Sequence, residues 1–119
     1  MNVKLLRRIA REIQKQPTAF DMRWLHTKDG AACNFTELDC GTAHCICGWA
    51  AVLLKNSDIQ NNRIGHEVFG IDEWQASRLF FVRAWPDKFA QLYGKRKTPQ
   101  AKAKVAAARI EHFIATGGE

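Results

Sequence analysis

The residues most capable of chemistry, cysteine and histidine, are concentrated in the segment CGTAHCICGW at positions 40–49. It holds three of the four cysteines of the chain and one of its four histidines. Cysteine and histidine are ligands that zinc prefers, and a cysteine at the start of a helix can become a reactive thiolate. Three interpretations follow: a metal site, a thiol site or a buried structural segment.

The spacing of the metal-ligating residues argues against zinc. Soft ligands are available at Cys33, Cys40, His44, Cys45 and Cys47. However, the sequence has no C-x-x-C knuckle followed by a second ligand pair. Two residues that lie two positions apart on a helix, as Cys45 and Cys47 would, point about 200° apart. We therefore expect no metal and no cofactor.

A thiol site is the second interpretation. With Thr42 as the N-cap of a helix, Cys45 becomes the third helical residue, where the positive end of the helix dipole lowers a thiol pKa. Cys40 lies just before that helix and can reach disulfide distance of Cys45. Cys40 and Cys45 are therefore the candidate thiol pair of a redox protein.

The simplest interpretation is structural, and we favour it. Unpaired cysteines are among the most buried residues and pack like small hydrophobic side chains. Cys45, Trp49, Val52 and Leu53 share helical spacing, and the run 43–54 is apolar on nearly every side. A helix that is apolar all round is buried all round, so this segment is predicted to be a buried central helix.

Two groups of basic residues are candidate contacts for nucleic acid or for an acidic partner. The formal net charge is +6, which permits such binding without requiring it. The first group lies on one face of a predicted helix over 3–16 and the second in a predicted loop. These residues are Lys4, Arg8, Arg11 and Lys15, and then Lys95, Arg96 and Lys97. A solvated charged surface is the simpler interpretation of both groups.

Residues 62–81 resemble the outline of a helix-turn-helix: a short helix, a turn containing Gly70, and a second helix. DNA binding through this element is the alternative function. Asp72 and Glu73 stand at the start of the second helix, where they would repel phosphates. Trp74 is expected to pack rather than to contact DNA.

Helical periodicity dominates the rest of the chain. Helices are predicted over 3–16, 43–54 and 64–69, from Asp72 to about 81, over 86–94, and from Pro99 to about 116. Asp72 and Gln75 are predicted to form a capping box, and Thr98 is predicted to cap the last helix, which Pro99 opens. Residues 27–41 are predicted to be a loop, with a short extended piece within 31–38. The predicted fold is a single all-α domain over 1–119, an irregular orthogonal bundle of five or six short helices.

Composition and N-terminal sequence limit the classes of protein. The 119 residues are 46% hydrophobic and 25% charged, which is ordinary for a globular domain. The N-terminal sequence has no secretory pattern, and no apolar run nears the ~20 residues of a membrane span. A cytoplasmic location with reduced cysteines is expected. A serine nucleophile elbow and a glycine-rich phosphate loop are both missing from the sequence, so we do not expect an enzyme.

Several segments together resemble a group of short bacterial and phage-borne proteins without an assigned function. These segments are CGTAHCICGWA at 40–50, FGIDEWQASRLF at 69–80, WP at 85–86 and RIEHFIATG at 109–117. The first matches a CGTxxCIxGWA pattern, from which Cys47 departs because a small residue such as alanine is usual there. The resemblance implies a shared fold but no activity, and it leaves Cys40 and Cys45 as the thiol pair of interest.

The sequence thus predicts a small intracellular binding or accessory protein, of phage or mobile-element origin, with a protein partner. Nucleic acid is the alternative partner, and no membrane contact is expected.

Overall fold

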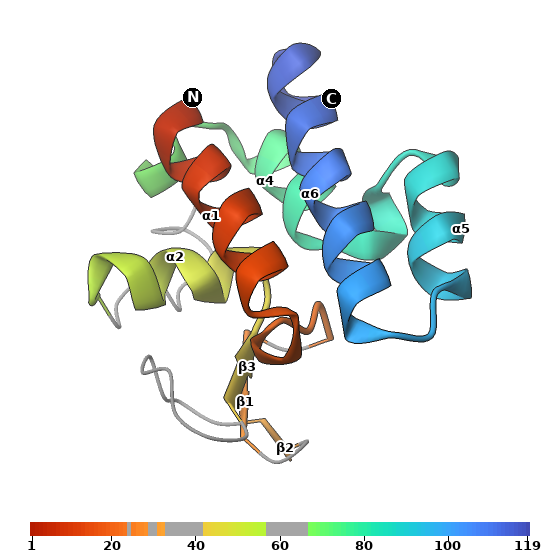
Figure 1. The fold of residues 1–119 in the computed structure, drawn as a ribbon. Coiled ribbons are helices and arrows are strands. Elements are labelled where there is room, and N and C mark those ends of the chain that lie inside the picture. Colours follow the sequence, from red (N-terminus) through yellow and green to blue (C-terminus); the bar gives the residue numbers. More distant parts are fainter. Residues whose placement is uncertain (24, 29–30, 33–41, 57–66) are drawn as a thin grey trace.

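The computed structural model describes residues 1–23, 25–28, 31–32, 42–56 and 67–119. The α-helices are α1 (Val3–Lys15), α2 (Ile46–Leu54), α4 (Glu73–Phe80), α5 (Asp87–Lys95) and α6 (Pro99–Ala115). Two short 3-10 helices are η1 (Pro17–Ala19) and η3 (Val82–Ala84), and the strands are β1 (His26–Lys28), β2 (Ala31–Ala32) and β3 (Thr42–His44). The predicted all-α class is confirmed, with a small sheet added to the helices (Figure 1).

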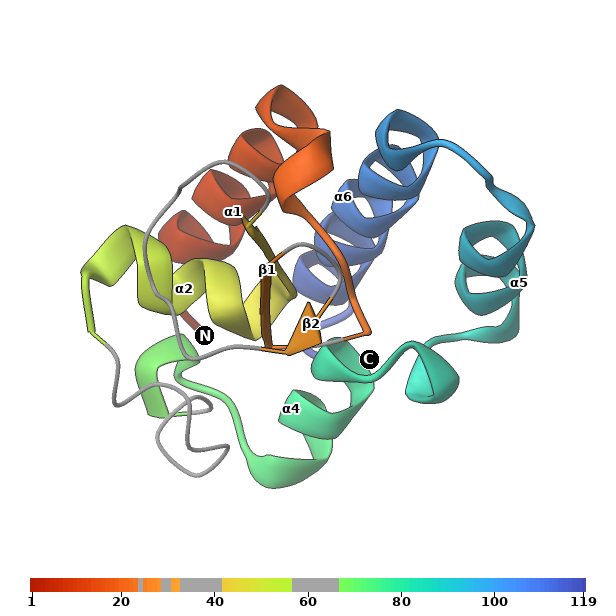
Figure 2. The ribbon, with the colours of Figure 1, turned by 90° about the horizontal axis from the view of Figure 1, so that it is seen from below.

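Helices α1 and α6 form the main packing of the domain. They run antiparallel side by side, and Figure 2 shows them together when the molecule is seen from below. Asn2 caps α1 through its side chain, which accepts from the N–H of Leu5 at 3.1 Å. Thr98 caps α6 and Pro99 occupies its first position, as predicted. Both helices bury an apolar face, so their contact makes up much of the core.

A three-stranded antiparallel sheet connects the first helix to the cysteine segment. The strand order is β2-β1-β3, and His26 pairs with His44 while Lys28 pairs with Thr42. Figure 1 shows this sheet below α1 and α2. The prediction of a loop over 27–41 is therefore wrong at residues 27–28, which lie in β1, whereas β2 falls within the short extended piece expected in 31–38.

Helix α2 starts later than the sequence indicated. Thr42 was expected to cap it, but the backbone of Thr42 pairs with β1, so the residue belongs to β3. Cys45 is the N-cap instead, and the helix begins at Ile46. The predicted burial is confirmed over Ile46–Ala51, whereas Leu54 at the far end is 44% exposed.

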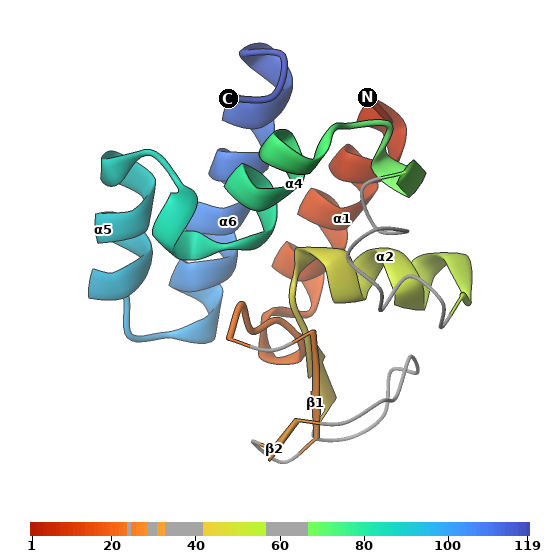
Figure 3. The same cartoon turned by 180° about the vertical axis from the view of Figure 1, so that it is seen from behind.

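The second half of the chain places three short helical elements around α6. Asp72 and Gln75 form the predicted capping box at the start of α4, each side chain bonding to the backbone of the other residue. Figure 3, which shows the molecule from behind, has α4 in front of α1 and α6. Trp85 anchors the following turn, since its Nε1 donates to Leu79 O at 2.9 Å.

Candidate functional site

Cys45 occupies the junction between β3 and α2. Its Sγ accepts a hydrogen bond from the N–H of Gly48 at 3.4 Å, and its own N–H donates to Leu25 O at 3.2 Å. The residue is only 6% exposed. Burial raises the pKa of the Cys45 thiol to about 11, which outweighs the hydrogen bonds that lower it. The expected low pKa is therefore wrong, because burial disfavours the thiolate more than the helix start stabilises it.

The other cysteines divide into one buried residue and two that fall outside the described residues. Cys47 is 2% exposed, and burial raises its pKa as well. Cys40, the predicted partner of Cys45, and Cys33 lie outside the described residues, so their pairing stays a prediction. The burial of Cys45 and Cys47 agrees with the structural interpretation of the segment.

Two buried histidines face each other across β1 and β3. Nδ1 of His26 and Nδ1 of His44 lie 2.6 Å apart, and the side chains belong to residues that are 1% and 0% exposed. Such a contact holds a single proton, because one ring nitrogen must donate and the other accept. Within the described part of the chain, nothing bonds to Nε2 of His26, and burial lowers the His26 pKa.

Trp49 completes this buried cluster. Its ring stands edge-on to the His44 ring at a centroid distance of 6.0 Å, and its Nε1 donates to Ala19 O at 3.0 Å. We call His26, His44, Cys45 and Trp49 the histidine corner. The pairing of His26 with His44 was not predicted from the sequence, because a cross-strand pair cannot be recognised until the strands are known. Among the described residues, no group of three or more possible ligands converges on a metal position.

The predicted basic residues are all exposed, but they do not form one cluster. Lys4, Arg8, Arg11 and Lys15 lie on α1, whereas Lys95, Arg96 and Lys97 lie at the end of α5 and in the link to α6. Of these seven, Arg11 lines a groove between α1 and α6, and Arg96 lines another between α5 and α6. One residue from each predicted basic group therefore lines a groove between two helices.

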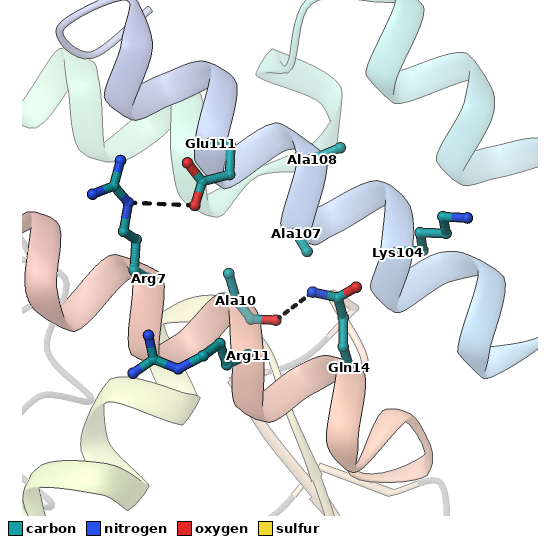
Figure 4. A pocket seen from close by; sticks show the side chains of 8 residues that line it. All are labelled: Arg7, Ala10, Arg11, Gln14, Lys104, Ala107, Ala108 and Glu111. Atoms are coloured by element: carbon teal, nitrogen blue, oxygen red, sulfur yellow. Dashed lines mark hydrogen bonds and ion pairs between the residues drawn. The ribbon is translucent and has the colours of Figure 1, made fainter.

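The groove between α1 and α6 has a volume of about 350 Å³. We call it the basic groove; it is lined by Arg7, Ala10, Arg11, Gln14, Lys104, Ala107, Ala108 and Glu111 (Figure 4). The alanines keep the space between the two helices open, and the longer side chains stand around it. Three cations and one carboxylate give these lining residues a net positive charge.

Only one of the three cations in the basic groove has an ion pair among the described residues. Arg7 Nε lies 3.5 Å from Glu111 Oε1, and both side chains are about half exposed. Arg11 and Lys104 extend from opposite helices and leave their charges to solvent. Sequence reasoning missed Arg7 as a lining residue, because Arg7 lies beside the basic stripe that was singled out rather than in it.

The helix-turn-helix outline is less suited to DNA than the sequence suggested. Of its predicted first helix over 64–69, residues 64–66 lie outside the described residues, and residues 67–69 are helical. Gln75 is engaged, since it completes the capping box and donates from Nε2 to Gly117 O at 3.0 Å. Trp74 is 77% exposed, so the prediction that it packs is wrong. Helix α4 turns Ala76, Leu79 and Phe80 toward the core and leaves Trp74 outside.

Arg109 is a buried charge that the sequence did not flag. It is 0% exposed and donates to Arg78 O at 3.0 Å and to Glu119 O at 2.8 Å. Its guanidinium also lies over the Phe113 ring, and burial lowers its pKa to about 10. These contacts tie α6 to α4, which makes Arg109 a structural residue rather than part of a binding surface.

The chain was compared with known proteins at three levels. No family model, no curated protein and no solved structure matches it. The resemblance to phage-borne proteins therefore stays a prediction from the quoted segments. None of the described helices is long and apolar enough to cross a membrane.

Proposed function

We propose that this chain is an accessory binding protein that recognises an acidic partner protein through the basic groove. The observation that carries the proposal is the placement of Arg7, Arg11 and Lys104 around an alanine-lined space with a single acid, Glu111. Opposite charges across an interface raise the association rate and fix the orientation of the partner.

The make-up of the groove favours a protein over nucleic acid. Duplex binding uses many cations directed at phosphates, and single-strand binding uses exposed aromatic rings for stacking. The lining residues of the basic groove include no aromatic ring, and Glu111 stands among its cations. A patterned surface of this kind suits a partner that carries both acidic and small or polar side chains.

The experiment is affinity capture from cells that express the chain with an affinity tag. Charge reversal by Arg11→Glu and by Lys104→Glu is compared with Lys55→Glu, which makes the same change at an exposed position at the end of α2. We expect the wild type and Lys55→Glu to retain the same acidic protein, and the two groove variants to lose it.

The two alternatives give different results in the same series. Equal capture by all four proteins contradicts the proposal. Binding of mixed-sequence duplex DNA that weakens steeply with salt and depends on Arg11 favours the DNA-binding alternative. A disulfide between Cys40 and Cys45 after mild oxidation favours the thiol alternative. The cytoplasmic location and the phage origin stay predictions, and fractionation of the expressing cells tests the first.

A further inference from the structure

A second groove lies beside the basic groove, between α5 and α6. It has a volume of about 380 Å³, and we call it the apolar groove; it is lined by Phe89, Leu92, Arg96, Ala101, Lys104, Val105 and Ala108. Lys104 and Ala108 also line the basic groove, so α6 forms a ridge that both grooves share. Figure 1 shows α6 between α1 and α5.

The floor of the apolar groove is hydrophobic and can be reached from solvent. Phe89 and Val105 are each 8% exposed and form its base, whereas Leu92 is 40% exposed at its edge. A leucine with this much exposed surface gains free energy when a partner covers it, at about 25 cal/mol per Å² of apolar area.

The edge of the apolar groove carries positive charge alone. Arg96 and Lys104 line it, and no acidic residue does so in the part of the chain that the structure describes. A second copy of the chain would bring the same cations face to face, which opposes a symmetric dimer through this surface. The charge complementarity points to an acidic occupant instead.

We propose that the partner presents an amphipathic acidic helix, whose apolar side enters the apolar groove while its carboxylates meet Lys104 and Arg96. This proposal rests on the proposed function and names the chemistry of the partner. Helices bind such grooves through apolar anchors spaced at i, i+3 or i+4, and i+7. Helix α5 has nine residues, which corresponds to about 13 Å and matches two to three turns of a bound helix.

The test is a selection of random 16-residue displayed peptides against the full chain, followed by fluorescence anisotropy with the recovered peptides. Leu92→Asp removes the apolar edge, and Leu54→Asp makes the same change at a leucine of similar exposure on α2, 44% against 40%. We expect acidic peptides with helical apolar spacing. Their affinity should fall about ten-fold or more with Leu92→Asp and with Lys104→Glu, but not with Leu54→Asp.

The outcomes separate this inference from the proposed function. If Lys104→Glu and Arg11→Glu weaken binding and Leu92→Asp does not, the apolar groove is not used and the inference fails while the proposed function stands. Recovery of basic or extended peptides also overturns it. If no variant on α1 or α6 changes binding, both proposals fail. Unfolding curves of Leu92→Asp and Leu54→Asp check that both variants fold.

Discussion

The histidine corner and the basic groove use their polar residues in opposite ways. In the corner, His26, His44 and Cys45 are enclosed, and each is bonded to a neighbour across a strand or within a helix turn. In the groove, Arg11 and Lys104 keep their charges in water. Burial shifts the pKa values of His26 and Cys45 against their charged forms, so both residues are structural at neutral pH. The charges of Arg11 and Lys104 stay hydrated and so carry little desolvation cost, and they are accessible to a binding partner.

The largest loss of stability should come from a substitution that pushes α2 away from the backbone of Leu25, beside the histidine corner. A Cβ atom at Gly48 would lie 2.0 Å from the backbone oxygen of Leu25, which cannot move without breaking its bond to Cys45. Gly48→Ala should therefore lower the free energy of unfolding by about 3 kcal/mol, measured in urea. Gly94→Ala is the matched control, since nothing lies within 4 Å of its added Cβ.

Gly94 lies in α5, so its replacement by alanine should stabilise the protein by about 0.5–1 kcal/mol. Stability changes of opposite sign for the two substitutions would show that Gly48→Ala destabilises through the close backbone contact at Leu25, and not through the loss of a glycine alone. Equal effects would contradict the packing described at Gly48.

The next largest effect on stability should come from protonation of His26 in the histidine corner. Burial lowers the pKa of His26 below its ordinary value of 6.5. The unfolded chain therefore takes up a proton at a higher pH than the folded chain does. Stability should be full above pH 6.5 and decrease as the pH falls from there toward the lowered pKa. Urea unfolding between pH 8 and pH 5 measures this slope.

His26→Leu should remove the contribution of His26 to that slope. It should also cost about 1–3 kcal/mol at pH 8, because His44 loses its partner at Nδ1. A variant with the same pH dependence as the wild type would show that His26 is not the group that titrates.

A smaller effect is expected at the cap of α2. Cys45→Ala removes the acceptor for the Gly48 N–H and should cost about 1 kcal/mol. With a pKa of about 11, only about one Cys45 thiol in a thousand is ionised at pH 8. Native protein should therefore resist a thiol reagent at Cys45 that labels it in denaturant, as peptide mass spectrometry can show. Rapid native labelling would revive the thiol alternative.

The smallest effect on stability belongs to the groove. Arg7 and Glu111 form an exposed ion pair, which contributes under about 0.5 kcal/mol. Glu111→Ala should leave the unfolding curve almost unchanged, while affinity for the acidic partner rises because a negative charge leaves the groove. Reduced affinity would mean that Glu111 contacts the partner itself.

Local patterns allowed much of the fold to be predicted. The helices over Val3–Lys15 and Pro99–Ala115 and the capping box of Asp72 and Gln75 depend on neighbours within four residues, and all were predicted. The strand at Thr42–His44 was missed, because the paired residues of its partner strand lie 14 to 18 positions earlier in the chain and threonine is also a good helix cap. The burial of Cys45 and Cys47 followed from their residue type.

The candidate site was predicted only in part, for a physical reason. Helical spacing identified the basic side of α1, but a groove exists only where two helices meet, and α6 supplies half of its residues. Arg7 could therefore be recognised as a groove residue only after the structure placed Glu111 and Ala107 of α6 opposite it. The burial of Trp74 was predicted wrongly because its residue type favours burial, whereas α4 buries Ala76, Leu79 and Phe80 and leaves Trp74 77% exposed.

The edge-on contact between Trp49 and His44 provides a built-in optical probe. An imidazolium quenches the emission of an adjacent indole more strongly than a neutral ring does. Trp49 and Trp85 are both buried and are expected to emit at the blue edge of the spectrum, whereas Trp74, 77% exposed, is expected to emit at longer wavelength. Of the two buried rings, Trp49 stands against His44 and Trp85 against Tyr93, so the response to acid at the blue edge is expected from Trp49. Tryptophan emission recorded at the short-wavelength and long-wavelength sides of the spectrum during an acid titration therefore follows the interior and the surface of the same unlabelled molecule.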